Sequence, residues 1–355
     1  MFGIRNARRI TIDRPPSALK RWGTPATSPQ GRRMRVIELR RETANALSLV
    51  LEPEDGQPFA AEAGQYLTHC FEIDGRLVKR AYSLSSPQGA APCCTVKLLP
   101  DGLASGFLAS LRPGSSYPVL GPSGDFRLRP DETGPLRFLA GGSGITPIIG
   151  LIETALARDP RRDIRLLYAN HSQSDIIFAS RLEALARRHP SLRIVHALSE
   201  RGERLDASRI AATLADDLPR GDARYYLCGP QGLMDLGETA LRAAGVPAAQ
   251  ILHERFLAAA RESSERPTAP QTITFRRSGR SVQQQPGETL LDAGLRAGLA
   301  LPFSCTVGGC AHCRIQVVQG RVAINEPNCL SPEERAAGYT LACSAYALEP
   351  VTLEF

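Results

Sequence analysis

Four cysteines near the C-terminus constrain the fold of this chain more than any other feature of its sequence. Cys305, Cys310 and Cys313 follow a C-x4-C-x2-C spacing, and Cys343 follows after a long interval. This spacing is typical of a [2Fe–2S] cluster, in which two irons share two sulfides and each iron takes two thiolates. We therefore predict that these four cysteines are the metal ligands of such a cluster.

Gly308 and Gly309 lie between the first two of these cysteines. Because glycine adopts positive φ without steric cost, we expect both to allow tight turns and to bring backbone N–H groups towards an anionic cluster. Two other uses of cysteine compete with this interpretation. Zinc sites usually pair two short units such as C-x2-C. Disulfides are typical of secreted chains, whereas nothing N-terminal resembles a signal peptide here.

Five further cysteines stand outside this pattern. Their odd number and irregular spacing give no disulfide framework, which fits a reducing cytoplasm, the location that we expect for this protein. They are Cys70, Cys93, Cys94, Cys228 and Cys329.

Residues 271–355 resemble a plant-type ferredoxin domain. Besides the cysteines, the resemblance includes a strand and turn at residues 272–279 and a helix at residues 288–294. It implies a β-grasp-like α+β fold. The segment departs from the family at Ala311 and His312, where many relatives have glycine followed by a small hydroxyl residue. We expect this change to alter the hydrogen bonding at the neighbouring sulfur but not the ligation.

The rest of the chain is long enough for further domains. A length of 355 residues exceeds one ordinary core and predicts two or three domains. No run of about 18 apolar residues occurs, so we expect no membrane span. We expect the protein to be a monomer.

The formal net charge of +7 arises at the N-terminus. Residues 1–33 contain eight basic side chains and one acid, Asp13, and this difference of seven accounts for the whole excess. We interpret residues 1–31 as a solvated basic arm, with a docking tail as the alternative and only a weak match to an organellar transit peptide. No DNA-binding element is visible, so we expect no nucleic-acid partner.

Residues 32–132 contain short alternating segments that predict a small antiparallel β-barrel. A turn is expected at Asp74 and Gly75. The predicted strands include residues 35–39, 47–51, 64–71 and 79–85, and a helix is predicted near residues 103–111.

Three motifs in this region belong together. Residues 80–86, R-A-Y-S-L-S-S, would alone be an ordinary strand and turn. With G-L-A-S at residues 102–105 and G-P-S-G-D-F at residues 121–126, they resemble the flavin domain of the ferredoxin-reductase superfamily, which carries R-x-Y-S and a later G-x-x-S.

Each motif suits a part of a flavin. Arg80 can neutralise the pyrophosphate, Tyr82 can stack on the isoalloxazine ring, and the Ser83 hydroxyl can reach the N5 edge. Gly102 precedes a helix whose first N–H groups favour phosphate. The predicted flavin-binding residues are Arg80, Ala81, Tyr82, Ser83, Lys97, Gly102, Leu103, Ala104 and Ser105.

After residue 132, strands and helices alternate. This pattern is typical of a doubly wound parallel sheet, so residues 133–257 predict an α/β nucleotide-binding domain. The predicted strands are residues 136–140, 164–169, 192–197, 224–228 and 251–256, and the predicted helices are residues 147–158, 178–188, 207–218 and 232–244.

Two glycine motifs in this domain indicate a dinucleotide site. One follows the first strand, where a pyrophosphate can meet a helix N-terminus, although such a turn can also be only a tight connection. The other closes the fourth strand, which we expect to lie beside the first. The pair resembles the NAD(P)-binding half of the same superfamily, and Cys228 would lie near the nicotinamide or serve as a buried structural thiol. The implied residues are Gly141, Gly142, Ser143, Gly144, Ile145, Thr146, Pro147, Cys228, Gly229 and Pro230.

Residues 251–256 end in E-R-F, and in relatives this E-x-F end lies over the flavin. Residues 258–270 are polar, contain two prolines and are expected to be a linker. The residues expected to shape the hydride-transfer site are Ser83, Thr146, Cys228, Glu254 and Phe256.

The order of flavin, nucleotide and iron–sulfur domains resembles the reductase components of multicomponent oxygenases, such as those of phenylacetyl-CoA epoxidases and ketosteroid hydroxylases. The resemblance implies that NAD(P)H gives a hydride to the flavin and that single electrons pass through the cluster to a separate oxygenase. A different one-electron acceptor, such as a hybrid-cluster protein or a desaturase, is the alternative, and a non-enzymatic redox sensor is a third.

Two cofactor choices follow from local residues. Gly124 is typical of the FAD group, whereas relatives that bind FMN tend to carry P-x-N-x-F there. NADH is favoured over NADPH because the second strand ends with His171 as its only candidate cation, mostly uncharged at pH 7, and with Asp175 nearby. Arg181 could reverse this argument, but we interpret it as a solvated side chain on the helix surface.

Overall fold

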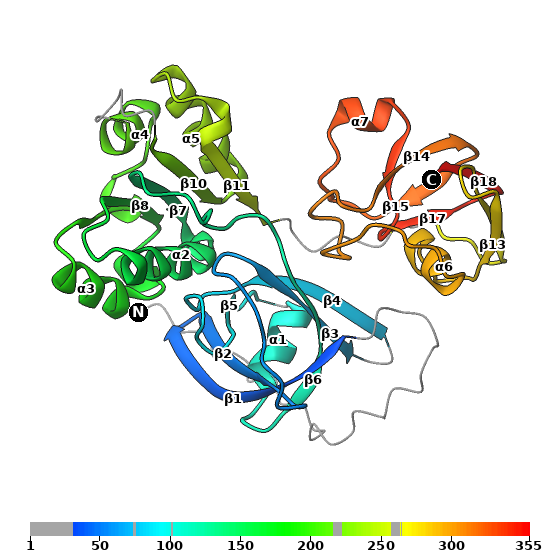
Figure 1. Ribbon diagram of the computed structural model, residues 1–355, viewed down its shortest axis with the longest axis horizontal. Coiled ribbons are helices and arrows are strands. Elements are labelled where there is room, and N and C mark those ends of the chain that lie inside the picture. The colour runs from blue at the N-terminus through cyan, green and yellow to red at the C-terminus, as the bar shows by residue number, and fades with distance from the viewer. Residues whose placement is uncertain (1–30, 74–75, 101, 216–221, 257–262, 264) are drawn as a thin grey trace, which may run out of the picture.

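The computed structural model describes residues 31–73, 76–100, 102–215, 222–256, 263 and 265–355. Three units are visible in Figure 1: a barrel from the N-terminal part, an α/β layer and a smaller C-terminal domain. The predicted basic arm (except residue 31), the turn at Asp74 and Gly75 and half of the predicted linker (residues 258–262 and 264) lie outside the described residues. Arg32 and Arg33, although part of the basic segment, belong to the first strand and pair with Asp55 and Glu54.

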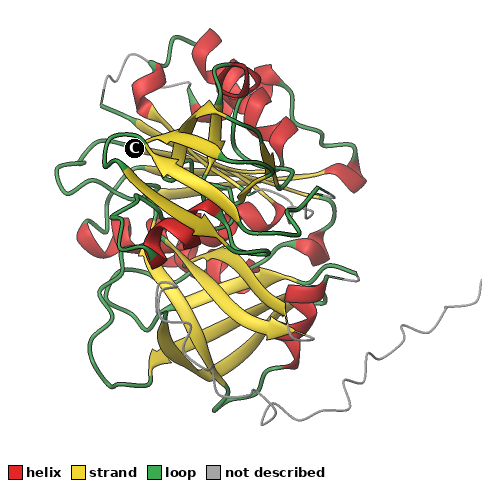
Figure 2. Ribbon diagram, turned by 90° about the vertical axis from the view of Figure 1, so that its right-hand side faces the viewer, coloured by secondary structure: helices red, strands yellow, loops and turns green. Residues whose placement is uncertain are grey.

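The N-terminal unit is a six-stranded antiparallel sheet in the order β4-β3-β6-β1-β2-β5. A bridge between Leu84 and Cys94 links its two edges, so the sheet curls into a barrel (Figure 2). Inward and outward residues alternate along the first strand: Met34 is fully buried while its neighbour Arg35 is exposed. The elements are β1 (Arg32–Thr43), β2 (Ala46–Pro53), β3 (Tyr66–Ile73), β4 (Arg76–Ser83), β5 (Cys93–Lys97), α1 (Leu103–Ser110) and β6 (Ser116–Ser123).

The second unit is a parallel sheet in the order β11-β10-β7-β8-β9. The chain starts in the middle strand, moves outwards to β9 and then returns to the other side of β7. The switch point, where ligands bind in such sheets, therefore lies between β7 and β10. The strands are β7 (Leu136–Gly141), β8 (Ile164–Asn170), β9 (Leu192–Leu198), β10 (Arg224–Gly229) and β11 (Ile251–Arg255).

Helices cover both faces of this sheet because both faces are apolar. Helices α2 and α3 share one buried cluster with the sheet, and α4 and α5 share another. The helices are α2 (Ile145–Arg158), α3 (Ala179–Arg188), α4 (Ala207–Leu214) and α5 (Gln231–Ala243).

Several helix boundaries differ from the sequence expectation, among them one end of α3 and one end of α4. Phe178 is not the first residue of α3 but its N-cap, because its left-handed φ of 65° lies outside the helical range; its side chain is buried. Helix α4 ends at Leu214, and the rest of the predicted helix beyond Ala215 lies outside the described residues.

The C-terminal unit is a mixed sheet in the order β13-β12-β18-β14-β16, with a second pair β15-β17. Helix α6 packs on it, and its N-terminus is a capping box in which Thr289 and Asp292 satisfy each other's backbone N–H groups. The elements are β12 (Gln271–Phe275), β13 (Arg280–Gln284), α6 (Leu290–Arg296), β14 (Arg314–Gln319), β15 (Val322–Ile324), α7 (Pro332–Ala336), β16 (Tyr339–Leu341), β17 (Ala345–Ala347) and β18 (Val351–Glu354).

All nine cysteines fall within the described residues, and none forms a disulfide. Within the described parts of the chain, no helix is long and apolar enough to cross a membrane.

Candidate functional site

The cluster loop, residues 303–313, is a chain of tight turns. Thr306, Gly308 and Ala311 all have positive φ, at 54°, 78° and 58°. Gly309, which we expected to share this role, does not. The two non-glycine residues in this conformation show that the loop is held by its surroundings rather than by glycine alone.

The four predicted ligand thiols converge. Cys305 interacts with both Cys310 and Cys343, and Cys343 interacts in turn with Cys313. Three of the four are buried, and Cys310 is partly exposed. Among the described residues no three ligating side chains surround a single ion-sized point, and the thiols instead form this row of pairwise contacts.

The surroundings of these thiols fit an anionic cluster. The backbone N–H groups of Val307 and Gly309 donate to the Cys305 sulfur at 3.5 and 3.2 Å. The N–H of Cys305 donates to the Cys310 sulfur at 3.4 Å. The buried Thr306 hydroxyl has no partner among the described residues, so it is free to donate a hydrogen bond to a cluster sulfide. These residues would hold a [2Fe–2S] cluster.

Cys329 lies beside the cluster loop without joining the row of thiols. Its backbone N–H donates to the Gly308 carbonyl at 3.0 Å, and burial raises the pKa of its thiol. It is therefore the residue against which the assignment of Cys343 can be tested.

The predicted flavin-binding residues of β4 line one strand of the barrel. Arg80 is partly buried, and the one acceptor that its guanidinium contacts among the described residues is the Lys79 carbonyl, at 2.7 Å. Tyr82 lies edge-on to His69, with ring centroids 5.3 Å apart. Arg80 has no carboxylate partner among the described residues, so its charge is available for a flavin diphosphate. Tyr82 lies two residues further along the strand and therefore on the same side, where its ring can pack on the flavin ring system.

The segment that precedes α1 is more tightly bonded than its sequence indicates. The Ser105 hydroxyl donates to the Gly102 carbonyl at 3.1 Å and accepts from the Leu99 N–H at 3.2 Å. A Cβ on Gly102 would lie 2.4 Å from that hydroxyl, which explains the glycine. Lys97 is exposed at the end of β5, and Leu103 is exposed at the start of the helix.

The two glycine motifs of the nucleotide domain lie side by side, as predicted. β10 pairs with β7 in parallel, with Cys228 opposite Ala140. A Cβ on Gly144 would lie 2.1 Å from the Cys228 carbonyl oxygen, and one on Gly229 would lie 2.9 Å from the Gly141 nitrogen. Side chains are thus excluded at the switch point, where a dinucleotide needs close approach to the backbone.

A short helical turn, Gly142–Gly144, separates β7 from α2. The Thr146 hydroxyl donates to the Ser143 carbonyl at 2.9 Å and is buried. Ile145 and Pro147 are buried beside it in the first turn of α2. Thr146 therefore stabilises this turn, and its hydroxyl proton is already donated to the Ser143 carbonyl rather than to a ligand.

Ser83, Glu254 and Cys228 come together where the barrel meets the nucleotide domain. The Ser83 hydroxyl donates to the Glu254 carboxyl at 2.7 Å. Cys228 and Glu254 are directly paired between β10 and β11. Burial raises the pKa of Glu254 to about 7 and, together with that carboxylate, raises the pKa of the Cys228 thiol. Glu254 can hold or release a proton near neutral pH, whereas Cys228 stays a neutral thiol.

Phe256 follows this strand and is 42% exposed. It lies two residues beyond Glu254 but contributes to none of the described buried clusters. An exposed aromatic ring two residues beyond Glu254 fits a residue that covers a flavin.

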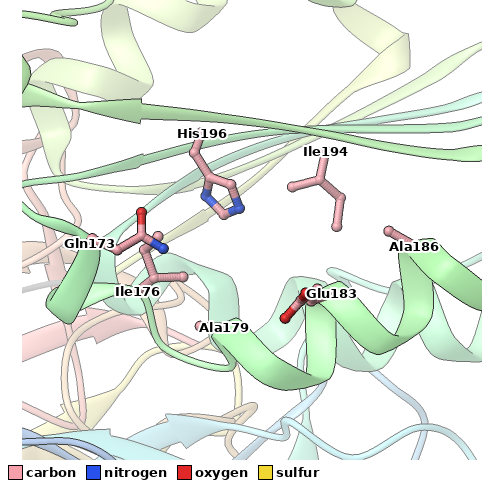
Figure 3. A pocket seen from close by; sticks show the side chains of 7 residues that line it. All are labelled: Gln173, Ile176, Ala179, Glu183, Ala186, Ile194 and His196. Carbon is pink, nitrogen blue, oxygen red and sulfur yellow. The ribbon is translucent and has the colours of Figure 1, made fainter.

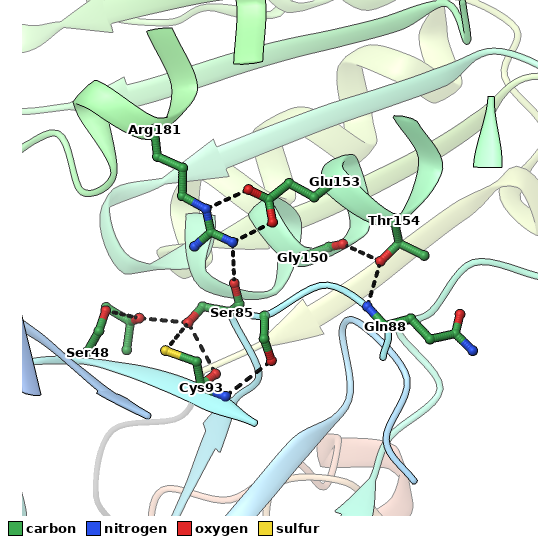
Figure 4. A network of polar contacts seen from close by, with 10 residues as sticks. Ser48, Ser85, Gln88, Cys93, Gly150, Glu153, Thr154 and Arg181 are labelled. Atoms are coloured by element: carbon green, nitrogen blue, oxygen red, sulfur yellow. Dashed lines mark hydrogen bonds and ion pairs between the residues drawn. The ribbon is translucent and has the colours of Figure 1, made fainter. Parts of the chain in front are cut away.

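A polar network ties the barrel to the nucleotide domain (Figure 4). The Arg181 guanidinium of α3 forms two hydrogen bonds with the Glu153 carboxylate of α2, one of them with an N–O distance of 2.6 Å. It also donates to the Ser85 carbonyl of the barrel at 3.2 Å. The Gln88 N–H donates to the Thr154 hydroxyl at 3.0 Å. Our interpretation of Arg181 as a solvated side chain is wrong, because helix α3 packs towards the barrel and leaves Arg181 partly buried and paired with Glu153.

A groove of about 280 Å³ lies between α3 and β9 (Figure 3). Its walls are mostly apolar, and its charged member is Glu183. A carboxylate would repel a pyrophosphate, and the groove lies beside α3 rather than at the switch point. We assign it no part in nucleotide binding.

Three residues near these sites were not predicted from the sequence. Tyr66 and Thr68 of β3 contact the cluster loop, and no local pattern indicates a contact across more than 200 residues of sequence. Arg201 follows β9 at the same edge as the end of β8, where the Glu200 N–H donates to the His171 carbonyl. The rule that ligands bind beyond the C-terminal ends of parallel strands could have indicated Arg201.

Three family models match the three units in order. They are described as an oxidoreductase FAD-binding domain at residues 35–128, an oxidoreductase NAD-binding domain at residues 138–238 and a 2Fe-2S iron-sulfur cluster binding domain at residues 273–348. The chain is thus an oxidoreductase with FAD, NAD(P)H and a [2Fe–2S] cluster as cofactors.

Relatives match this chain over most of its length. An NADPH oxidoreductase of Mycobacterium tuberculosis is 35% identical, over 89% of this chain and 83% of its own. The ferredoxin reductase component of the 3-ketosteroid-9-alpha-monooxygenase of Rhodococcus rhodochrous is 32% identical, over 93% and 98%. The structure of phthalate dioxygenase reductase superposes with a TM-score of 0.67 at 23% identity, over 91% of this chain and 97% of that chain, which shows the same fold. The chain belongs to the family of NAD(P)H-dependent flavin and iron–sulfur reductase components of oxygenase systems.

Proposed function

We propose that this protein delivers electrons, one at a time, to a separate terminal oxygenase that binds it transiently. The proposal is supported by direct contacts between successive units. The Ser83–Glu254 hydrogen bond links the barrel to the nucleotide domain, and Tyr66 of β3 links the barrel to the cluster loop. When bound, the flavin accepts a hydride and gives up single electrons, and the cluster carries one electron at a time.

The residues of the chain supply positions and charges for this chemistry. Arg80 would hold the flavin diphosphate, Tyr82 would pack on the flavin ring system, and the glycines Gly141 and Gly229 would let the dinucleotide approach the backbone. Ser83 and Glu254 would lie where the nicotinamide meets the flavin, and the pair can hold a proton at the Glu254 carboxyl near pH 7. The exposed Phe256 ring would cover the flavin and keep water from it.

An acceptor assay tests the electron-transfer role. The purified protein should oxidise NADH or NADPH rapidly with cytochrome c and with ferricyanide as acceptors. Replacing Cys343 by alanine should abolish cytochrome c reduction while ferricyanide reduction by the flavin persists. Slow coenzyme oxidation with both acceptors would contradict an enzymatic role and would favour a redox sensor. An oxygenase that is captured by the reduced protein and turns over only in its presence would identify the partner.

A further inference from the structure

Two side chains of the barrel contact the cluster loop directly. The Tyr66 hydroxyl lies 2.6 Å from the Ser304 hydroxyl. The Thr68 hydroxyl donates to the Cys305 carbonyl at 2.9 Å. Thr68 is 1% exposed and Tyr66 is 9% exposed, so water competes poorly for these hydrogen bonds.

The geometry of β3 explains why these two residues act together. Residues two apart in a strand face the same side, so both hydroxyls point towards the same loop. Their partners are consecutive residues, and one of them, Cys305, is a cluster ligand. The barrel therefore contacts the main chain of a ligand rather than a distant surface of the C-terminal domain.

The same strand also borders the flavin site. Tyr66 is directly paired with Ser83 between β3 and β4, and Thr68 is paired with Ala81. Gly124 packs against the Tyr66 ring: a Cβ there would lie 3.0 Å from two ring carbons. The ring is thus held on one side by the segment that we associated with FAD and bonded on the other to the cluster loop.

We propose that Tyr66 and Thr68 are positioning residues that dock the cluster loop on the flavin barrel and thereby set the rate of electron transfer between the two sites. This inference rests on the proposed function. Neither hydroxyl accepts or donates an electron. The two electrons that enter with one hydride leave singly, and the two side chains fix only the distance and orientation across which each one passes.

Anaerobic stopped-flow mixing with NADH or NADPH separates the two steps, because loss of flavin absorbance precedes reduction of the cluster. The test variant is Tyr66→Phe combined with Thr68→Val, which removes both hydroxyls and keeps the shapes. The matched control is Tyr117→Phe, which removes a buried phenol hydroxyl bonded to His69 inside the same barrel. Hydrogen–deuterium exchange at residues 303–309 reports docking independently of turnover.

In the double variant, the cluster-reduction phase should slow about tenfold, because two hydrogen bonds of ordinary strength shift a docking equilibrium by about that factor or more. The flavin-reduction phase, the iron content, the EPR signal of the cluster and its midpoint potential should stay unchanged. Exchange at residues 303–309 should rise. The control should match the wild type in all of these.

An unchanged cluster phase or unchanged exchange would overturn the proposal. Equal slowing of both phases, or a shifted potential or EPR signal, would also overturn it, because the side chains would then act on the fold or on the cluster itself. A wild-type protein whose cluster is never reduced by NADH or NADPH would instead contradict the proposed function. That result is recognisable before any variant is made.

Discussion

At Glu254 the fold surrounds a carboxyl with protein atoms and gives it one hydroxyl donor. Burial, opposed by the Ser83 hydrogen bond, raises its pKa from 4.5 to about 7. Between these two values the folded protein keeps a proton that the unfolded chain has released. The stabilisation by this group is therefore complete below about pH 4.5 and is lost as the pH rises to about 7.

Glu254→Gln should remove this dependence. Between about pH 5 and 7, the free energy of unfolding of the wild type should fall more steeply than that of the variant, by about 1.4 kcal/mol per pH unit. Denaturant unfolding of the flavin-free protein at several pH values measures the difference. Glu72→Gln, at an exposed site on β3, is the matched control and should follow the wild type. Identical slopes in all three proteins would contradict the shifted pKa.

Ala311 has φ of 58°, a conformation that favours glycine. Many relatives carry glycine here, but the sequence alone could not indicate that Ala311 adopts a positive φ in this chain. Ala311→Gly should stabilise the C-terminal domain by about 0.5–1 kcal/mol, because relief of strain exceeds the added entropy of the unfolded chain. Thermal unfolding followed by cluster absorbance measures it.

Ala297→Gly is the opposite control. Ala297 caps α6 with φ of −81°, so glycine relieves nothing there and should destabilise the domain by a few tenths of a kcal/mol to about 1 kcal/mol. Destabilisation by both substitutions would show that the loop conformation at Ala311 is different.

Strand periodicity and glycine positions predicted most of the elements, because their causes are local. The pairing of Cys228 with the end of β7 followed from the topology of parallel sheets. Contacts such as that between Ser83 and Glu254, or between Tyr66 and Ser304, depend on how the folded domains pack against one another. A single sequence carries no pattern for them.

The packing of α3 on the barrel gives a test at the scale of elements. Arg181→Ala should break the bonds to Glu153 and Ser85 and loosen the nucleotide domain on the barrel. We expect the rate of flavin reduction by NADH to fall about threefold to tenfold, since partly buried charged hydrogen bonds contribute about 1 kcal/mol or more. Stopped-flow absorbance measures the rate. Arg187→Ala, on the exposed face of the same helix, should have no effect.

We expect the choice of coenzyme to depend on the residues at the ends of β8 and β9. We predict a higher kcat/KM for NADH than for NADPH, because this edge offers little to a 2′-phosphate. Arg181 is paired with Glu153, and the Asp175 carboxylate accepts a hydrogen bond from Ser172. Steady-state kinetics with both coenzymes measures the preference. A clearly higher value for NADPH would contradict it. If the preference for NADPH were then lost in Arg201→Ala but kept in Arg187→Ala, Arg201 would be identified as the cation that binds the 2′-phosphate.

At the scale of the molecule, the barrel contacts both other units, through Ser83 and Glu254 on one side and through Tyr66 and Ser304 on the other. The order of the three units was predictable, since each carries its own motif. Their relative placement was not, because it depends on a few side chains from different domains.

The most direct test of this account is anaerobic reduction of Cys343→Ala, with Cys329→Ala as the matched control. The wild type and Cys329→Ala should contain about two irons and two labile sulfides per chain. On mixing with NADH, both should lose flavin absorbance and then develop the EPR signal of a reduced cluster. Cys343→Ala should lose iron and the EPR signal while its flavin is still reduced at the wild-type rate. Loss of the cluster in Cys329→Ala but not in Cys343→Ala would contradict the account.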